Sequence, residues 1–433
     1  MSSARFEPSG PLRGGLRPPS DKSISHRAAL IAAMGEGTTE IRGYLDAADT
    51  RSTLAAVEAV GGRVENADPA RIAGELRIHG VGLRGAGSAA IDVGNAGTLL
   101  RLLPGWLAGQ VGESWVLDGD ESIRRRPVDR IAVPLREMGA RLSAREDRLP
   151  PLEIEGAPLR GITYEMPIAS AQVKSCLLFA GLLAEGETRV VEPLPSRDHT
   201  ERMLIAAGAQ VRQEGLAVAV QPTERLEPGL IAVPADISSA AFFIVAALLV
   251  PGSEVLLEGV GVNQTRTGLL QILDRMGADL VESELTGEYG GEPTADIVVR
   301  SASLRATEVG GAEIPLAIDE LPLVALAACF AEGTTVIRDA EELRRKESDR
   351  VETVTAALRA LGGKVEPLAD GMVVEGSGGL RGGTIESHGD HRIAMLGAVA
   401  GLASKEGVEV QGMDAAAVSY PGFESDLNRL LGS

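Results

Sequence analysis

Hydrophobic and polar residues follow the same order six times along the chain. In each copy a glycine precedes a short run rich in Val and Ile, a polar loop, a stretch with apolar residues at helical spacing, and a second strand-like run. The two closest copies are residues 37–65, "GTTEIRGYLDAADTRSTLAAVEAVGGRVE", and residues 333–366, "GTTVIRDAEELRRKESDRVETVTAALRALGGKVE". Looser copies begin at Gly112, Gly186, Gly252 and Gly407. The pattern predicts six repeats of one strand–helix–strand design.

A second predicted helix accompanies each copy and is apolar on nearly every side, which requires burial on every side. These helices begin within residues 20–33, 93–107, 168–183, 234–249, 317–331 and 388–402. A chain of 433 residues exceeds what one hydrophobic core usually organises. We therefore expect two α/β domains of three repeats each, with three apolar helices at the centre of each domain and a crossing near residue 234.

Composition excludes several classes of partner. The net charge of −19 argues against nucleic acid and anionic membranes, since both select broad basic surfaces. The longest uninterrupted apolar run, residues 240–250, is too short to span a bilayer, and the N-terminus lacks the apolar segment of a signal peptide. Cys176 and Cys329 lie in apolar helical runs, which is typical of reduced, buried thiols. A cytoplasmic location is expected.

Polar residues gather where the apolar helices begin. Ser, Asn and Asp there are explained by capping, but Lys22, Arg27, Lys174 and Arg392 are not, because a cation opposes the positive end of the helix dipole. Cations at helix starts indicate an anion bound between them. The polar loops add further cations, namely Arg124, Arg125, Arg126, Arg197, Lys346 and Arg350, which suit phosphate and carboxylate recognition.

Four acids lie near these cations in the sequence: Asp49, Asp236, Asp319 and Glu347. They either balance charge or transfer protons, and the sequence leaves both interpretations open. "GVGLRG", residues 80–85, fits a dinucleotide fingerprint but no amphipathic helix follows it, so we interpret it as a turn. His388 and His391 lack further His or Cys ligands nearby in the sequence, so no metal is expected. No G-x-S-x-G elbow or Walker loop supports a hydrolase or an NTPase.

Seven motifs in order, "SDKSISHR", "GNAGT", "GDESIRRRP", "SAQVKS", "SRDHT", "KESDR" and "GDHR", resemble the 5-enolpyruvylshikimate-3-phosphate (EPSP) synthase family of enolpyruvyl transferases. The resemblance covers essentially the whole chain. It implies a two-domain inside-out α/β barrel, each domain built of three βαβαββ units around buried parallel helices. Residues 1–20 and 235–433 would form a discontinuous domain and residues 21–234 an inserted one, with the active site in the cleft between them.

The resemblance also implies the reaction. The family transfers the enolpyruvyl group of phosphoenolpyruvate to the 5-hydroxyl of shikimate 3-phosphate and releases phosphate, in the shikimate pathway to aromatic amino acids. It implies no cofactor, small-molecule substrates as the only partners, and a monomer. Because Gly97 is kept where tolerant members carry alanine, it implies inhibition by glyphosate.

Site residues follow from the matching motif positions. The resemblance gives catalytic roles to Lys22, Asp319 and Glu347. Shikimate 3-phosphate would contact Lys22, Ser23, Arg27, Ser170, Gln172, Ser196, Arg197, Asp319 and Lys346. Phosphoenolpyruvate would contact Lys22, Gly97, Arg126, Gln172, Arg350 and Arg392. Which of the three catalytic residues moves which proton stays open.

The chain departs from the family pattern at two positions. Val418 stands where some members carry a lysine that holds phosphoenolpyruvate, and Ala171 stands where some carry a serine. Two alternatives also remain. The sister transferase that acts on UDP-N-acetylglucosamine typically uses a cysteine on a mobile loop, and neither cysteine here is so placed. A non-catalytic anion-binding paralogue should have lost Lys22, Asp319 or Glu347, and this chain keeps all three.

Overall fold

The computed structural model describes residues 2–67, 72–283, 287–288 and 291–432, and it divides the chain into two compact units. Unit 1 comprises Met1–Pro19, Ala235–Gly287 and Pro293–Ser433; unit 2 comprises Ser20–Pro234 and Glu288–Glu292. The sequence interpretation had placed Glu292 in the discontinuous domain. The structure groups it with unit 2, where its carboxylate lies 2.7 Å from Nδ1 of His199 and both side chains are buried.

The described residues of unit 2 form three sheets of one topology. In each sheet the first two strands are parallel and the remaining neighbours are antiparallel. The strand orders are β14 (Leu230–Ala232), β3 (Thr38–Arg42), β5 (Ile72–His79), β4 (Arg63–Ala67); β6 (Ala89–Asp92), β7 (Ser114–Asp118), β9 (Leu149–Glu155), β8 (Arg141–Arg145); and β10 (Thr163–Glu165), β11 (Thr188–Val191), β13 (Ala217–Val220), β12 (Val211–Glu214).

Unit 1 repeats this topology within its described residues. Its orders are β2 (Arg13–Leu16), β15 (Glu254–Gly261), β18 (Pro293–Arg300), β16 (Asp279–Glu282), with β17 (Gly287–Glu288) paired to β18; β19 (Glu308–Val309), β20 (Thr334–Ile337), β22 (Gly371–Glu375), β21 (Lys364–Leu368); and β23 (Gly383–Glu386), β24 (Val408–Gln411), β1 (Ser3–Phe6). The last repeat lacks strands of its own after β24, and β1 from the start of the chain pairs antiparallel with β24 instead. Unit 1 therefore needs both ends of the chain.

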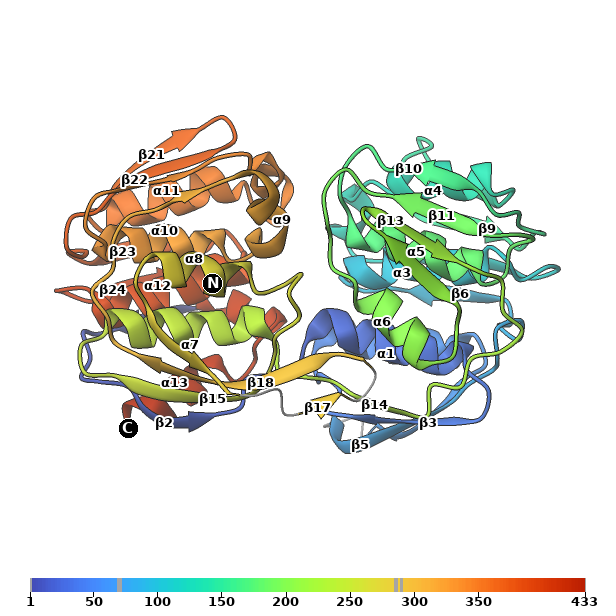
Figure 1. Ribbon diagram of the computed structural model, residues 1–433, viewed down its shortest axis with the longest axis horizontal. Coiled ribbons are helices and arrows are strands. Elements are labelled where there is room, and N and C mark those ends of the chain that lie inside the picture. Colours follow the sequence, from blue (N-terminus) through green and yellow to red (C-terminus); the bar gives the residue numbers. More distant parts are fainter. Residues whose placement is uncertain (1, 68–71, 284–286, 289–290, 433) are drawn as a thin grey trace. The chain divides into compact units, whose positions relative to one another are not determined.

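The predicted apolar helices form the centre of each unit. They are α1 (Lys22–Met34), α3 (Gly97–Leu107) and α5 (Ala171–Gly181) in unit 2, and α7 (Ile237–Leu249), α10 (Leu321–Phe330) and α12 (His391–Ala403) in unit 1. Every residue of α7 is buried, and the three inner helices of unit 1 pack against one another (Figure 1). Strands such as β8 and β9 alternate between exposed and more buried residues, as expected for a sheet that covers this core. The helices lie inside and the sheets outside, which confirms the inside-out α/β fold.

A second set of helices belongs to the outer layer. These are α2 (Ala48–Ala59), α4 (Asp129–Glu137), α6 (His199–Ala206), α8 (Gly268–Arg275), α11 (Arg350–Ala360) and α13 (Phe423–Leu431), with the short α9 (Ile314–Ala317) and the 3-10 turns η1 (Ile123–Arg125), η2 (Gly311–Glu313), η3 (Glu341–Arg345) and η4 (Met413–Val418). Each of α2, α4, α6, α8, α11 and α13 buries one face and exposes the other. In the part of the chain that the structure describes, no helix is both long and apolar enough to cross a bilayer.

Glycine explains two features of this packing. The six glycines that open the repeats all have positive φ, from 76° at Gly407 to 101° at Gly333, a conformation that L side chains rarely adopt. Gly105 serves a different purpose, because a Cβ there would lie 2.0 Å from the backbone oxygen of Cys176. Helices α3 and α5 can therefore approach closely. With aromatics at only 3% of the chain, small residues do this packing.

Candidate functional site

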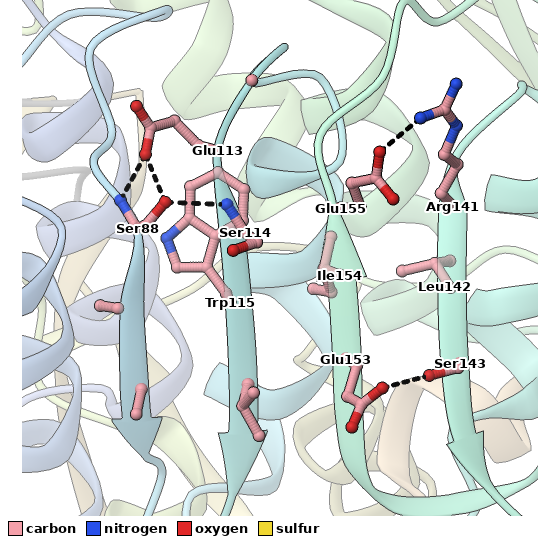
Figure 2. A pocket seen from close by; sticks show the side chains of 14 residues that line it. Ser88, Glu113, Ser114, Trp115, Arg141, Leu142, Ser143, Glu153, Ile154 and Glu155 are labelled. Atoms are coloured by element: carbon pink, nitrogen blue, oxygen red, sulfur yellow. Dashed lines mark hydrogen bonds and ion pairs between the residues drawn. The ribbon is translucent and has the colours of Figure 1, made fainter.

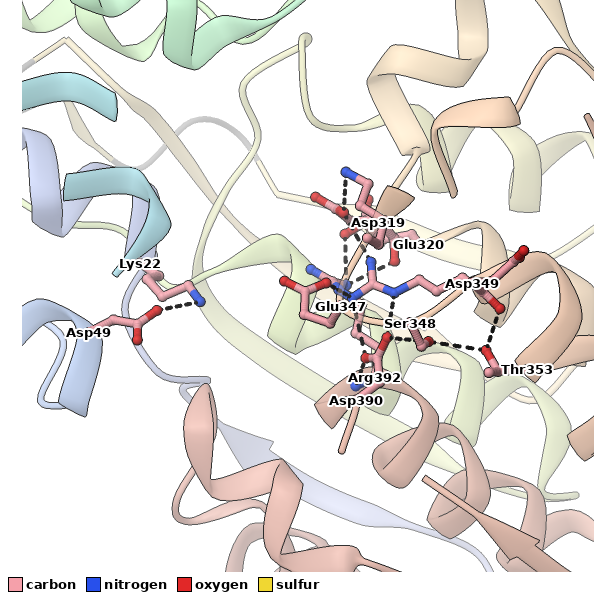
Figure 3. Close-up of polar contacts among 12 residues, drawn as sticks. Lys22, Asp49, Asp319, Glu320, Glu347, Ser348, Asp349, Thr353, Asp390 and Arg392 are labelled. Atoms are coloured by element: carbon pink, nitrogen blue, oxygen red, sulfur yellow. Dashed lines mark hydrogen bonds and ion pairs between the residues drawn. The ribbon is translucent and has the colours of Figure 1, made fainter. Parts of the chain in front are cut away.

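Helix α1 presents the first group of predicted residues. Asp21 caps the helix by accepting from the backbone N–H of Ile24 at 2.8 Å. The Lys22 side chain is 28% exposed, and its Nζ lies 3.1 Å from Oδ2 of Asp49, which belongs to α2 (Figure 3). Asp49 therefore balances the charge of Lys22, while the ammonium keeps access to solvent and to a ligand.

Arg27 is buried and held by three hydrogen bonds. Its Nε donates to Oγ1 of Thr200 at 2.7 Å, Nη1 to the backbone oxygen of Ser23 at 2.9 Å, and Nη2 to Oγ of Ser175 at 2.9 Å. A guanidinium has five N–H donors, so two are not accounted for by these bonds. Burial lowers the pKa of Arg27 to about 10, which leaves it charged at neutral pH. Ser175 and Thr200 are functional candidates that sequence reasoning missed, although both lie in or beside the quoted motifs.

His26 lies between Lys22 and Arg27 in the motif "SDKSISHR" but is not a cation. It is fully buried, and its Nδ1 lies 2.6 Å from Oγ1 of Thr53. Burial lowers its pKa to about 3, and the charges of Lys22 and Arg27 add to this effect. His26 is therefore neutral and structural.

Helices α3 and α5 place four further candidates. Ser170 caps α5, and Gln172 accepts from Nη1 of Arg101 at 2.8 Å and donates to Oγ1 of Thr98 at 3.0 Å. At the start of α3, a Cβ on Gly97 would lie 2.5 Å from Nη1 of Arg126. Arg126 thus lies directly over the first turn of α3. Any side chain at position 97 would force the Arg126 guanidinium to move.

Lys174 corrects one step of the sequence argument. Its Nζ lies 2.7 Å from Oε2 of Glu192 and 2.7 Å from Oε1 of Glu201, and all three side chains are at most 5% exposed. The anion that this helix-start cation indicated is supplied by the protein itself. Ser196 and Arg197 lie in the loop beside this cluster, where Ser196 donates to Glu192.

Arg350, at the start of α11, is the centre of the site residues in unit 1. Its guanidinium is 1% exposed and donates from Nε to Oδ2 of Asp390 at 2.9 Å, from Nη2 to Oε2 of Glu347 at 2.6 Å, and from Nη1 to Oδ1 of Asp319 at 3.3 Å (Figure 3). Burial alone would lower the pKa of Arg350, but the charges of these three carboxylates raise it well above its usual value. Asp390 was missed, although it stands within the motif "GDHR".

Asp319 precedes α10 and is surrounded by cations. Nζ of Lys346 lies 3.2 Å from its Oδ1, and Nη1 of Arg266 lies 4.0 Å from its Oδ2. Nη1 of Arg392 donates to the backbone oxygen of Asp319 at 2.9 Å and lies 3.4 Å from Oε1 of Glu320. Arg266 and Glu320 were not predicted, because the sequence around each resembles an ordinary loop or helix start.

Two carboxylates of this cluster, Glu347 and Asp390, are ionised. Burial would raise the pKa of Glu347, but the charges of Arg350 and His391 outweigh it and lower the pKa to about 2. Burial would likewise raise the pKa of Asp390, and Arg350 outweighs it by charge and hydrogen bonds. Asp319, Glu347 and Asp390 thus converge on one guanidinium, so the site cations Lys346, Arg350 and Arg392 are paired with protein carboxylates rather than gathered in an empty positive pocket.

The remaining predicted positions contribute less. Val418 belongs to η4 and is 42% exposed. Asp236 caps α7 and lies 3.5 Å from Nη2 of Arg266. Among the described residues, no group of three or more His, Cys, Asp or Glu side chains is arranged to hold a metal ion.

A hollow on the outer face of the sheet β6–β7–β9–β8 contains none of the predicted residues (Figure 2). Its polar side chains are paired with one another: Glu113 accepts from Ser88, Glu153 accepts from Ser143 at 2.7 Å, and Arg141 pairs with Glu155. We assign no site to it.

Fold and site together define a protein with two three-repeat units, each of which presents Lys and Arg side chains at helix starts, a class suited to small anionic substrates. The model of the EPSP synthase (3-phosphoshikimate 1-carboxyvinyltransferase) family matches residues 6–427. The 3-phosphoshikimate 1-carboxyvinyltransferases of Anaeromyxobacter sp. and Methylococcus capsulatus are 52% and 49% identical, over 97% and 98% of this chain and 96% of each relative. The solved EPSP synthase of Acinetobacter baumannii is 44% identical, with a TM-score of 0.90 over 99% of this chain and 98% of that one. The chain belongs to the EPSP synthase family.

Proposed function

We propose that the protein transfers the enolpyruvyl group of phosphoenolpyruvate to the 5-hydroxyl of shikimate 3-phosphate and releases phosphate, the reaction of 3-phosphoshikimate 1-carboxyvinyltransferase (EC 2.5.1.19). The observation that carries the proposal is the cluster around Arg350, in which a buried guanidinium lies beside two acids that match catalytic positions of the family, Asp319 and Glu347. Family membership gives the substrates, and the cluster gives the groups that the chemistry requires.

The two substrates would be divided among the charged groups as follows. Phosphoenolpyruvate would be held by Lys22, Gly97, Arg126, Gln172, Arg350 and Arg392. Shikimate 3-phosphate would be held by Lys22, Ser23, Arg27, Ser170, Gln172, Ser196, Arg197, Asp319 and Lys346. These residues come from both units, so we propose that both units act on one pair of substrates. Guanidinium and ammonium donors match phosphate and carboxylate oxygens.

Proton transfer would use the acids beside these cations. In the addition step the 5-hydroxyl oxygen bonds to C2 of phosphoenolpyruvate, its proton passes to Asp319, and the methylene carbon takes a proton from Glu347 or Lys22. In the elimination step phosphate leaves C2 and takes up the proton held by Asp319, and the methyl group formed in the addition step returns one proton to Glu347 or Lys22. Glu347 is a carboxylate while Arg350 holds it. When Arg350 turns to the anion of phosphoenolpyruvate, the pKa of Glu347 should rise and allow it to carry the proton.

Phosphate release tests this proposal most directly. The purified chain would be given phosphoenolpyruvate without added metal, with shikimate 3-phosphate in one sample and UDP-N-acetylglucosamine in another. Release only with shikimate 3-phosphate is expected, and release only with the nucleotide sugar would assign the chain to the sister transferase. The two cysteines support the first outcome, because Cys176 and Cys329 are both buried within helices.

We propose further that the chain needs no cofactor and works in the cytoplasm as a monomer. A single species of about 45 kDa in sedimentation, at the concentration used for the activity assay, would support the monomer. A mass of twice that value would contradict it.

A further inference from the structure

Lys174 stands in the helix-start pattern but has no part in the proposed reaction. Its side chain is 2% exposed and contacts Glu192, Glu201 and, at 3.5 Å, the backbone oxygen of Ser196. A buried ammonium between two carboxylates has little left to offer a ligand. It does, however, tie together three separate segments of unit 2.

These segments are α5, α6 and the loop that joins β11 to α6. Lys174 lies on α5, Glu192 directly follows β11, and Glu201 lies on α6. The hydroxyl of Ser196, in the middle of the loop, donates to Oε1 of Glu192. The loop is therefore fixed through Lys174, and it carries Arg197, which we place at the phosphate of shikimate 3-phosphate.

The same two helices also fix Arg27. Ser175 of α5 and Thr200 of α6 both accept from its guanidinium, and their hydroxyl oxygens lie 2.6 Å apart. Each is a chain neighbour of a member of the ion cluster, Lys174 or Glu201. A shift of α6 along α5 would therefore move the loop of Arg197 and a partner of Arg27 together.

The ion cluster holds these helices only while the ammonium is present. Burial alone would lower the pKa of Lys174, but Glu201 and Glu192 outweigh it and raise the pKa, so Lys174 is charged. Burial raises the pKa of Glu201, which shares the single cation with Glu192. Without Lys174 the two buried carboxylates would repel each other or take up protons. In either case the contact that joins the three segments is lost.

We propose that Lys174 is a positioning residue for the acceptor substrate: through Glu192 and Glu201 it fixes the loop at residues 192–198 and helix α6, and so places Ser196, Arg197 and Arg27. The inference rests on the proposed function. It concerns the acceptor substrate, because Ser196, Arg197 and Arg27 are all assigned to shikimate 3-phosphate and none of them to phosphoenolpyruvate.

The test measures binding of shikimate 3-phosphate by calorimetry and the KM for phosphoenolpyruvate at saturating acceptor. Lys174→Met should weaken acceptor binding about tenfold, the effect of misplacing one charge-assisted hydrogen bond to the ligand, while the KM for phosphoenolpyruvate changes less than about twofold. Lys174→Arg keeps the charge and should recover most of the affinity. Lys364→Met is the matched control, since Lys364 forms an exposed pair with Glu375.

Glu192→Gln keeps the inference testable if Lys174→Met does not fold. It leaves one buried carboxylate for one ammonium, so the fold is retained, but it removes the charged acceptor of Ser196. Acceptor binding should weaken severalfold with no loss of melting temperature. If folded Lys174→Met or Glu192→Gln binds shikimate 3-phosphate as tightly as the unaltered chain, the inference is overturned and the proposed function is not affected. Failure of the unaltered chain to bind shikimate 3-phosphate would overturn the proposed function, and the inference with it.

Discussion

Replacement of Asp390 by alanine would remove the buried anion that holds Arg350. The Asp390 side chain is 0% exposed and accepts from Arg350 at 2.9 and 3.2 Å, from Oγ of Ser348 at 3.0 Å, and from the backbone N–H of Arg392 at 2.9 Å. Removing one partner of a buried ion pair typically costs about 3–5 kcal/mol, and losing a helix cap about 1 kcal/mol. Arg350 keeps Glu347 as a partner. We therefore expect a loss near the lower end, about 3 kcal/mol of unfolding free energy.

Urea unfolding, monitored by circular dichroism, would measure this loss as the difference in unfolding free energy between Asp390→Ala and the unaltered chain. Asp390→Asn keeps an oxygen for the cap and for Ser348, so its loss should be about half as large. Glu375→Gln serves as the surface control, because Glu375 and Lys364 are exposed and such pairs contribute at most about 1 kcal/mol. If Asp390→Ala unfolds within about 1 kcal/mol of the unaltered chain, Arg350 does not depend on Asp390 and the reasoning is refuted.

Three further predictions concern the reaction and its pH dependence. Asp319→Ala should still bind shikimate 3-phosphate but lose at least about 100-fold in turnover, as for a positioned acid or base; undiminished turnover would remove it from the mechanism. Gly97→Ala should raise both the KM for phosphoenolpyruvate and the inhibition constant of glyphosate, because the new Cβ would lie 2.5 Å from Nη1 of Arg126; steady-state kinetics with equal values for both chains would contradict this. The pKa of Glu347 is lowered from 4.5 to about 2, so its contribution to stability is present above pH 4.5 and is lost as the pH falls toward 2. Melting temperatures across this range should therefore fall less steeply in Glu347→Gln, and parallel curves would argue against the assignment.

Much of the fold follows from local pattern. The repeat glycines mark turns with positive φ, and the helices that are apolar on every side are the buried ones, as their composition requires. The sequence could not show the two long-range features. One is the pairing of β1 with β24, which closes the last repeat, and the other is the contact of Glu292 with His199, which groups Glu292 with unit 2. Both depend on contacts between residues that are far apart in the chain and carry no periodic signal.

The site was predictable only where the resemblance supplied motifs. Chemical type alone treated Lys174 and Lys22 alike, since both are lysines in the first turn of an apolar helix. The structure separates them by their neighbours: two carboxylates at 2.7 Å enclose Lys174, whereas Lys22 has one at 3.1 Å and remains partly exposed. Arg266 is the opposite case, a site residue that its sequence context did not reveal. It stands in an ordinary loop sequence, and only the folded chain brings it to 4.0 Å from Asp319.

The pairing of cations with protein acids changes how substrate binding should be understood. A phosphate or carboxylate that reaches Lys22 or Arg350 would not enter an empty positive pocket; it would replace Asp49 on the first and Glu347 on the second. The Coulomb energy gained with the substrate is therefore partly offset by the ion pair that is lost. If Arg350 turns to the substrate as proposed, Glu347 would lose the cation that keeps its pKa low, and its pKa should rise. Under the proposed function, Glu347 would thus hold Arg350 before the substrate binds and would carry a proton afterwards.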